Sequence, residues 1–348
     1  MSHRVTIIIP CRNEAAHVDH AVSDALAQER RGFDIEVLVA VGPSEDDTQG
    51  IVERIAAKNP EVVLVENPAG VVPHGLNAAI RLATGDFIVR MDAHSRYPND
   101  YVAVLTEALD RLHADNTGGV WETLPANGSN KAWAIAQVLS SPLGVGNAMF
   151  RIGVEGEQEV DTVPYGCFRR ELFDRIGFFD EELIRNQDDE HNGRIIKAGG
   201  RIMLLPQVRI QYYGRDQISK LWRMYREYGL FKPLVNIKLG APATLRQFAP
   251  PLFVLALLGL PLLALALPLL SLGWAVMVSA YLLVVAVVSA RIAAAGSRMS
   301  ALLWMLVAFF TVHVAYGVGY LQGIVRFVLL GRRVRPADIP HHRPHAPD

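Results

Sequence analysis

Runs of apolar residues separated by amphipathic stretches organise the first ninety positions of the chain. Residues 4–10 (RVTIIIP) have the continuous apolar character of a buried strand, and residues 15–28 place their apolar side chains at helical spacing. Strands that alternate with helices predict an α/β fold with a mostly parallel sheet, whose ligand lies at the carboxyl ends of the strands. Because no G-x-G-x-x-G motif follows the first strand, a dinucleotide-binding fold is disfavoured. Further strands are expected at 35–41, 62–65 and 87–91, and further helices at 47–59 and 75–83.

The pattern changes completely after residue 246. Residues 247–290 contain no Asp, Glu, Lys or Arg, and these 44 residues are roughly twice as long as the bilayer hydrocarbon is thick, at about 1.5 Å per helical residue. They predict two membrane spans separated by the uncharged turn PLLSLG at 268–273. Residues 299–325 form a third uncharged segment, expected either to span or to be re-entrant or interfacial. The alternative, a buried helical core of a soluble domain, is disfavoured by the length of these runs.

Basic residues around these segments predict the orientation of the membrane part. The positive-inside rule places Arg246, Arg291 and Arg298 in the cytosol and the turn at 268–273 outside. Three full spans would then put the basic segment GRRVR (331–335) outside, against the rule, whereas an interfacial third segment keeps it inside. The terminal His341, His342 and His345 are either metal ligands or part of a disordered tail.

Composition narrows the class of protein. A hydrophobic content of 51% and a mean hydropathy of +0.20 are high for a wholly soluble chain. A net charge of −1 without a long basic run excludes a nucleic-acid binder. Only Cys11 and Cys167 are present, far apart, so a disulfide framework and a thiol zinc site are excluded and a reducing compartment fits best. The N-terminal MSHRVTIIIP is too short for a signal peptide, which predicts a cytosolic front half.

Two acidic foci carry candidate chemistry. The first is Asp92-Ala93-His94, directly after the expected strand 87–91. If the extended conformation continues for three residues, the side chains of Asp92 and His94 point to one side and can bind one divalent ion. The alternative is a turn aspartate next to a surface histidine.

The second focus is the sequence NQDDE at 186–190, which opens an expected helix running to residue 198. Asn186 is a good N-cap, acids suit the first turn, and Glu190 and Arg194 form an i, i+4 pair, so helix capping explains most of the pattern. Capping does not require three consecutive carboxylates, which repel one another. The cluster is therefore a candidate for a general base that takes a proton from a hydroxyl.

Taken together, these pieces resemble the family 2 glycosyltransferases of GT-A fold, in particular the membrane-anchored bacterial subgroup that includes the succinoglycan-type glucosyltransferases. The resemblance covers about the first 240 residues. The matching stretches are VTIIIPCRNE at the start, GLNAAI at 75–80, IVRMDAHSRYP at 88–98, ADNTGGV at 114–120, SSPLGVGNAMFR at 140–151, PYGCFRRELFDRIGFFDEEL at 164–183 and NQDDEHNGRIIKAGGRI at 186–202.

The resemblance implies a nucleotide-sugar donor, a divalent metal (Mn²⁺ or Mg²⁺) and a hydroxyl acceptor. Asp92-Ala93-His94 stands in place of the family's D-x-D, with Asp92 toward the nucleotide or metal and His94 as a metal ligand. Asp188 matches the aspartate of the family's E-D pair, which implies that it is the catalytic base of an inverting displacement. The donor-binding residues implied in addition are Pro10, Asn13, Glu14 and Asn77.

Two departures from the family pattern affect specificity. The chain reads VGPSEDDT at 41–48 where the family has an acidic pair that contacts the nucleotide base, which puts the donor's identity in doubt. Gln187 stands where the pair's glutamate is expected, and loss of that like charge should make Asp188 less basic. The Q-x-x-R-W signature of processive synthases is absent, which favours transfer of a single sugar.

The segment between the two halves of the chain mixes aromatic and basic residues. Residues 216–238 predict a basic amphipathic helix at the lipid headgroup layer, where Trp222, Arg223, Arg226 and Lys232 could face a lipid-linked acceptor, the alternative being a packing helix under the sheet. The expected organisation is a cytosolic GT-A catalytic domain at 1–215, interfacial helices at 216–246, a membrane domain at 247–330 and a disordered tail at 331–348.

The resemblance, together with the apolar segments, implies a metal-dependent hexosyltransferase of the bacterial inner membrane that faces the cytosol. We expect it to move one sugar from a nucleotide donor, a UDP-hexose, to a polyprenyl-linked acceptor during assembly of a surface polysaccharide. Two rival hypotheses are a polyprenyl-phosphate glycosyltransferase, whose acceptor is the lipid phosphate itself, and a non-catalytic membrane scaffold of the same fold.

Overall fold

The computed structural model describes residues 3–242, 244–332 and 334 of the 348-residue chain, and these residues form two compact units. The first unit contains the described residues of 1–122 together with 152–212. The second contains 123–151 and 213–332. The segment 123–151, expected within the catalytic domain, therefore groups with the C-terminal helices.

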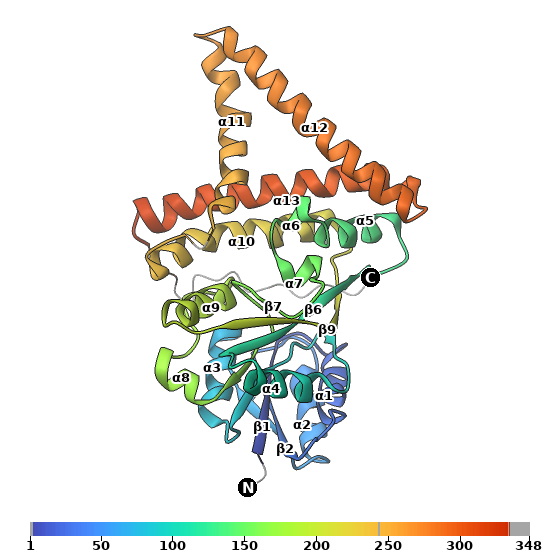
Figure 1. The fold of residues 1–348 in the computed structure, drawn as a ribbon, viewed down its shortest axis with the longest axis vertical. Coiled ribbons are helices and arrows are strands. Elements are labelled where there is room, and N and C mark those ends of the chain that lie inside the picture. The colour runs from blue at the N-terminus through green and yellow to red at the C-terminus, as the bar shows by residue number, and fades with distance from the viewer. Residues whose placement is uncertain (1–2, 243, 333, 335–348) are drawn as a thin grey trace. The chain divides into compact units, whose positions relative to one another are not determined.

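The first unit is built on a mixed sheet with the strand order β3-β2-β1-β4-β8-β6-β9-β5, and β7 pairs with β9 (Figure 1). The first four strands are parallel: Ile7 of β1 aligns with Val37 of β2 on one side and Val89 of β4 on the other. Ile7, Ile8 and Ile9 are at most 1% exposed, because a parallel sheet is covered on both faces. The strands are β1 His3–Cys11, β2 Phe33–Val41, β3 Val62–Glu66, β4 Phe87–Arg90, β5 Ser95–Arg96, β6 Asn116–Leu124, β7 Gln158–Glu159, β8 Cys167–Arg169 and β9 Ile202–Tyr213.

The helices of this unit follow the expected alternation with the strands. The structure confirms the predicted α/β architecture, and the predicted helix ends differ from the observed ones by one to three residues. Helices α1 and α2 pack on each other and on β2, while α3 packs on β1, β2 and β3. The helices are α1 Val18–Leu26, α2 Thr48–Ala56, α3 Val72–Leu82, α4 Tyr101–Arg111, α8 Glu171–Ile176 and α9 Gln187–Lys197.

Helices make up almost all of the second unit. Three segments are long and apolar enough to cross a membrane, at Leu245–Ala264, Leu269–Ala295 and Met299–Leu329. Only 17% and 6% of an 18-residue stretch of the first two are buried, so most of their leucine side chains are exposed, which fits contact with lipid. The helices are α5 Asn130–Leu139, α6 Pro142–Val145, α7 Met149–Ile152, α10 Ile218–Leu239, α11 Ala249–Ala264, α12 Leu269–Ala295 and α13 Leu302–Gly323, with short turns at η1 Leu245–Phe248, η2 Met299–Ala301 and η3 Ile324–Leu329.

Helices α11 and α12 form a hairpin, and α13 runs alongside α10 across the base of that hairpin (Figure 1). The hairpin is tied by the Trp274 indole of α12, which donates to the carbonyl oxygen of Leu257 at 3.1 Å. The third apolar segment therefore differs from the first two, because 44% of it is buried against other parts of its own unit.

Small residues let α10 and α13 approach backbone to backbone. A Cβ atom added at Gly319 would overlap the carbonyl oxygen of Arg226, and one at Gly323 would overlap that of Leu230. Gly229 on α10 is equally close to the backbone of Tyr316. Glycines at a spacing of four residues are typical of tight helix pairs in membranes.

Candidate active site

Arg90, the last residue of β4, holds two of the predicted acidic side chains together. Its side chain is only 4% exposed. Nη1 donates to both carboxylate oxygens of Asp188, at 2.7 and 2.9 Å, while Nε and Nη2 donate to the oxygens of Asp92 at 3.0 and 3.3 Å. The guanidinium carbon also lies 5.2 Å from the centroid of the Tyr165 ring. Asp92 and Asp188, far apart in the sequence, thus share one buried cation.

Burial sets the proton affinity of Asp188. It raises the pKa of this carboxyl group to about 6, because a poorly solvated environment disfavours the charged form. Arg90 opposes the rise, and the charges of Asp92 and Asp189 add to it. The neutral Gln187 removes one like charge, yet burial leaves Asp188 more basic than an ordinary aspartate. Since 23% of its side chain remains exposed, Asp188 can still receive a proton from a bound molecule.

The three consecutive carboxylates of α9 point to three different partners. Asp188 pairs with Arg90, and Asp189 accepts a hydrogen bond from the Thr162 hydroxyl at 3.3 Å. Glu190 takes two hydrogen bonds from Arg194, at 2.7 and 3.0 Å, which confirms the expected i, i+4 pair. Their repulsion is relieved because successive side chains on a helix diverge.

The start of α9 differs from the sequence expectation. Asn186 occupies the expected N-cap position, but it adopts a left-handed conformation with φ of 61° and its side chain makes no capping hydrogen bond. Asparagine tolerates this conformation better than most residues.

The D-A-H sequence after β4 does not remain extended. The backbone turns at Ala93 and His94, and the Ser95 amide donates to the carbonyl oxygen of Asp92 at 3.3 Å. The carboxylate of Asp92 faces Arg90, whereas Nδ1 of His94 lies 3.4 Å from Oε1 of Glu14. Across the described ranges, no three His, Cys, Asp or Glu side chains gather into a cluster that could hold a metal ion. The assumption of continued extension was wrong, and the metal-binding roles of Asp92 and His94 stay predictions.

Asn13 and Glu14 belong to a loop that is tied to its neighbour at the carboxyl edge of the sheet. The Asn13 side-chain oxygen accepts from the amide of Glu45 at 2.8 Å, and the Glu14 amide donates to the Thr48 hydroxyl at 2.8 Å. Pro10 lies just before this loop and is buried in β1. The geometry therefore places all three predicted donor-binding residues at the strand ends where α/β proteins bind ligands.

Asp46 lies in the loop after β2, a few residues beyond the Val41 and Gly42 that stand where the family pattern has an acidic pair. Its carboxylate accepts hydrogen bonds from the Ala15 amide at 3.0 Å and from the Thr48 amide at 3.1 Å, and it also accepts one from the Thr48 hydroxyl. Burial raises the pKa of Asp46, but these hydrogen bonds outweigh it and lower the pKa below the ordinary value. Asp46 therefore holds the first two loops together.

Asn77 on α3 makes hydrogen bonds within the protein through both the nitrogen and the oxygen of its side-chain amide. Nδ2 donates to the carbonyl oxygen of Phe179 and to Oε1 of Glu181, both at 2.9 Å, and Oδ1 accepts from the Phe179 amide at 3.0 Å. These bonds fix the loop between α8 and α9, which precedes Asp188. Its predicted contact with the donor remains a prediction.

Comparison with known proteins identifies the family. Residues 6–177 match the family described as Glycosyl transferase family 2. The succinoglycan biosynthesis protein ExoA of Rhizobium meliloti (strain 1021) is 33% identical over 246 residues, which are 70% of this chain and 73% of that protein. The chain belongs to glycosyltransferase family 2.

Two further relatives of this family 2 glycosyltransferase are more distant. A Methanococcus voltae protein named dolichyl N-acetyl-alpha-D-glucosaminyl phosphate 3-beta-D-2,3-diacetamido-2,3-dideoxy-beta-D-glucuronosyltransferase is 26% identical over 237 residues, covering 66% of this chain and 73% of its own. The structure of mannosyltransferase PcManGT from Pyrobaculum calidifontis, in complex with GDP-Man and Mn²⁺, superposes with a TM-score of 0.58 at 22% identity, covering 92% of this chain and 88% of its own. This similarity confirms the GT-A fold.

The most informative residue that sequence reasoning missed in this family 2 glycosyltransferase is Arg90. A signal existed, because an arginine inside the apolar run FIVRM, next to an aspartate, is costly to bury without a counter-charge. Two buried tyrosines were missed as well: the Tyr97 hydroxyl accepts from the Asp92 amide at 2.6 Å, and the Tyr165 ring packs on Arg90. Neither contact follows from residue spacing.

The predicted lipid-side residues lie on α10, in the second unit. Trp222, Arg223 and Arg226 are exposed, and Lys232 is half-buried. Arg226 Nε donates to Oε1 of Gln322 on α13 at 2.8 Å, so this cation is partly committed to helix packing. The terminal His341, His342 and His345 lie outside the described residues.

Proposed function

We propose that this family 2 glycosyltransferase transfers a single sugar, with inversion, from a nucleotide-sugar donor to a hydroxyl of a polyprenyl-linked acceptor. The observation that carries the proposal is the buried Arg90, which holds Asp188 beside the Asp92 of the D-A-H sequence. This arrangement supports a base and a donor-binding carboxylate acting within one site.

In the proposed reaction Asp188 accepts the proton of the acceptor hydroxyl. The acceptor oxygen then forms a bond to the anomeric carbon, and the bond between that carbon and the diphosphate oxygen breaks. The nucleoside diphosphate leaves with the bonding electron pair. Arg90 contributes by orienting both oxygens of Asp188 and by keeping the carboxylate ionised at neutral pH.

The donor is proposed to lie over the loops that follow β1 and β2, near Pro10, Asn13 and Glu14. Hydrogen bonds between these loops make the surface rigid before the ligand arrives, which lowers the entropic cost of binding. A UDP-hexose remains our proposal for the donor.

Asp92 and His94, with Glu14 beside the imidazole, are the residues proposed to hold Mn²⁺ or Mg²⁺. One carboxylate and one imidazole form a donor set that suits Mn²⁺ when diphosphate oxygens supply the remaining ligands. The complex of the fold neighbour PcManGT with GDP-Man and Mn²⁺ supports this proposal. When bound, the ion would offset the negative charge on the departing diphosphate.

The acceptor is proposed to be lipid-linked and to be elongated at the cytosolic face of the bacterial inner membrane during assembly of a surface polysaccharide. The exposed apolar hairpin α11–α12 and the names of the two relatives, one in succinoglycan biosynthesis and one acting on a dolichyl-linked sugar, support this. We further propose that α11 and α12 span the membrane, whereas α13 lies along its surface together with α10.

Replacement of Asp188 by asparagine tests the proposal. Asp188→Asn keeps the size of the side chain but cannot accept the proton, so turnover should fall by about 10²–10⁴-fold while donor affinity stays within a few-fold. Asp189→Asn is the matched control, because the neighbouring carboxylate bonds to Thr162 instead of Arg90 and should leave turnover nearly unchanged.

Release of nucleoside diphosphate, measured with membrane lipid extract as acceptor, serves as the assay. Substantial turnover by Asp188→Asn would remove Asp188 as the base and favour the rival in which the lipid phosphate itself attacks, since that acceptor needs no deprotonation. A labelled product that survives mild acid favours sugar-to-sugar transfer. Absence of any nucleotide release by the unmodified protein would favour the scaffold hypothesis.

A further inference from the structure

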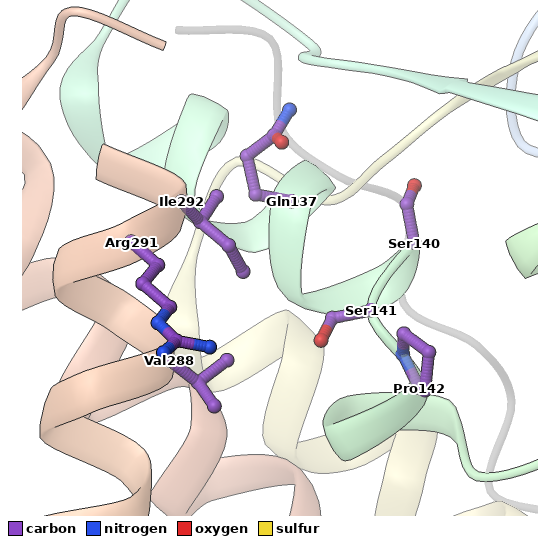
Figure 2. Close-up of a pocket in the computed structure, with 7 residues that line it drawn as sticks. All are labelled: Gln137, Ser140, Ser141, Pro142, Val288, Arg291 and Ile292. Atoms are coloured by element: carbon purple, nitrogen blue, oxygen red, sulfur yellow. The ribbon is translucent and has the colours of Figure 1, made fainter. Parts of the chain in front are cut away.

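A cavity of about 400 Å³ lies within the second unit, between helices α5 and α6 on one side and the C-terminal part of α12 on the other (Figure 2). Its lining is amphiphilic. Val288 and Ile292 of α12 are apolar, while Arg291 of α12 and Ser141 before α6 are polar. Figure 2 shows the Arg291 guanidinium and the Ser141 hydroxyl pointing toward the space between these elements.

Arg291 is the only charged residue in the 27-residue helix α12. Among the residues that the structure describes, its guanidinium has no ion-pair or hydrogen-bond partner. A charged side chain in a membrane helix is costly and is generally retained where it meets a partner of opposite charge. Because Arg291 is exposed, its guanidinium is available to an anion that does not belong to the described protein.

The position of Arg291 along α12 indicates where that anion lies. Arg291 follows the first residue of the helix, Leu269, by 22 residues, which at about 1.5 Å per residue is about 33 Å. This distance matches the hydrocarbon thickness of about 30 Å. If Leu269 lies at one face of the membrane, Arg291 therefore lies in the headgroup layer of the opposite face. Lipid phosphates are located in that layer.

The walls of the cavity are fixed by packing and hydrogen bonds. Helices α5, α10, α12 and α13 share one buried apolar cluster, which includes Leu139, Val285 and Phe309. Nε2 of His313 on α13 lies 2.8 Å from the carbonyl oxygen of Leu143 in α6, and its Nδ1 lies 2.9 Å from the hydroxyl of Tyr281 in α12. A carbonyl oxygen only accepts, so Nε2 carries a proton, and in the neutral imidazole the tyrosine donates to Nδ1.

The polar wall is held by the turn between α5 and α6. The carbonyl oxygen of Ser141 accepts from the amides of Gly144 and Val145 at 2.8 and 3.0 Å, which fixes the backbone of Ser141. The Ser140 hydroxyl donates to the carbonyl oxygen of Ala136 at 3.1 Å. Ser141 and Arg291 therefore offer polar groups to a ligand from opposite walls, beside the Gln137 and Ser140 of the α5 side.

We infer that this cavity binds the phosphate of the lipid-linked acceptor, with Arg291 and Ser141 on the phosphate oxygens and Val288 and Ile292 against the first carbons of the isoprenoid chain. The identity of the lipid rests on the proposed function. Arginine and hydroxyl donors match phosphate oxygens, and the apolar side of the cavity favours a phosphate that carries a hydrocarbon chain over a free one.

Farnesyl phosphate is a suitable probe, titrated against the purified full-length protein in neutral detergent with binding followed by thermal shift and native mass spectrometry. We expect saturable binding of farnesyl phosphate and at least tenfold weaker binding of farnesol and of inorganic phosphate. Arg291→Gln should weaken the binding of farnesyl phosphate by about tenfold or more, and Ser141→Ala by a few-fold.

Arg298→Gln is the matched control, because it removes a positive charge seven residues further on whose guanidinium lies over the Trp133 ring instead of lining the cavity. It should change the affinity by less than twofold. Equal losses in Arg291→Gln and Arg298→Gln would overturn the inference, since attraction would then be non-specific. Equal binding of phosphatidylglycerol or of inorganic phosphate would overturn it as well.

The same preparation separates this inference from the proposed function. Binding of the nucleotide-sugar donor to the unmodified protein, measured without lipid, tests the transferase proposal alone. A protein that binds donor but not farnesyl phosphate contradicts only the cavity assignment, and one that binds farnesyl phosphate but no donor contradicts only the proposed function.

Discussion

Replacing Arg90 by glutamine should reveal how strongly the site depends on one buried cation. Asp92 and Asp188 both bond to this guanidinium, and its side chain is 4% exposed. Removing one partner of a buried ion pair leaves an uncompensated charge and costs about 3–5 kcal/mol. At about 2–4 °C per kcal/mol for a domain of this size, Arg90→Gln should lower the melting temperature by about 6–20 °C.

The matched control is Arg111→Gln. Arg111 also makes a two-bond pair, with Glu157 at 2.6 and 2.9 Å, but its side chain is 56% exposed. Exposed pairs contribute about 0–1 kcal/mol, so this variant should melt within about 4 °C of the unmodified protein. Thermal unfolding of the full-length chain in detergent, followed by tryptophan fluorescence, measures both variants.

A double variant strengthens the test. Arg90→Gln combined with Asp188→Asn removes the unpaired carboxylate as well as the guanidinium, and should recover part of the lost stability. The single variant should also raise the pKa of Asp188 above about 6, because Arg90 is the group that favours its ionised form. If Arg90→Gln melts within 4 °C of the unmodified protein, the reasoning about a shared buried cation is refuted.

Three further predictions concern protonation, metal binding and helix packing. The ratio kcat/KM should rise as the pH increases through about 6 and then level off, because Asp188 must be ionised to accept a proton and its pKa is about 6. A profile that is flat from pH 5 to pH 8 would exclude this carboxyl group as the base. Asp92→Ala and His94→Ala should weaken donor binding, measured by thermal shift in the presence of Mn²⁺. If the unmodified protein keeps its full turnover in the presence of a chelator and without added metal, the metal site is contradicted. Gly319→Ala should lower the melting temperature, because the added Cβ overlaps a backbone oxygen of α10 and overpacking costs about 1–3 kcal/mol. The control Gly273→Ala should leave the melting temperature unchanged, because a Cβ there meets no atom within 4 Å. Equal effects of the two substitutions would refute the tight helix pair.

The orientation of the C-terminus gives one more test of the membrane arrangement. If α13 lies along the membrane surface, a reporter fused to the C-terminus should be on the same side as Arg246, in the cytosol. Activity of a periplasmic reporter such as alkaline phosphatase at that position would show instead that α13 spans.

The spacing of apolar residues along the chain was enough to predict its α/β and membrane-helix architecture. A buried strand and an amphipathic helix each require apolar residues at a characteristic spacing, and this spacing can be read directly from the sequence. The buried run around Ile7, the helix spacing that follows it, and the charge-free residues 247–290 each predicted an element that the structure contains. Motif order then identified the family, since several short stretches in the right sequence are more specific than any one of them. The position of Asp188 at the start of a helix also followed from local pattern.

Tertiary structure decided everything that depends on which distant groups meet. Spacing predicted an extended backbone through Asp92 and His94, but the backbone turns at Ala93, and Asp92 bonds to Arg90 while His94 lies next to Glu14. The raised pKa of Asp188 and the pairing of α10 with α13 likewise depend on burial and on backbone approach between residues far apart in the chain. Burial, counter-charge and close packing are properties of three-dimensional neighbours, and a one-dimensional pattern does not specify them.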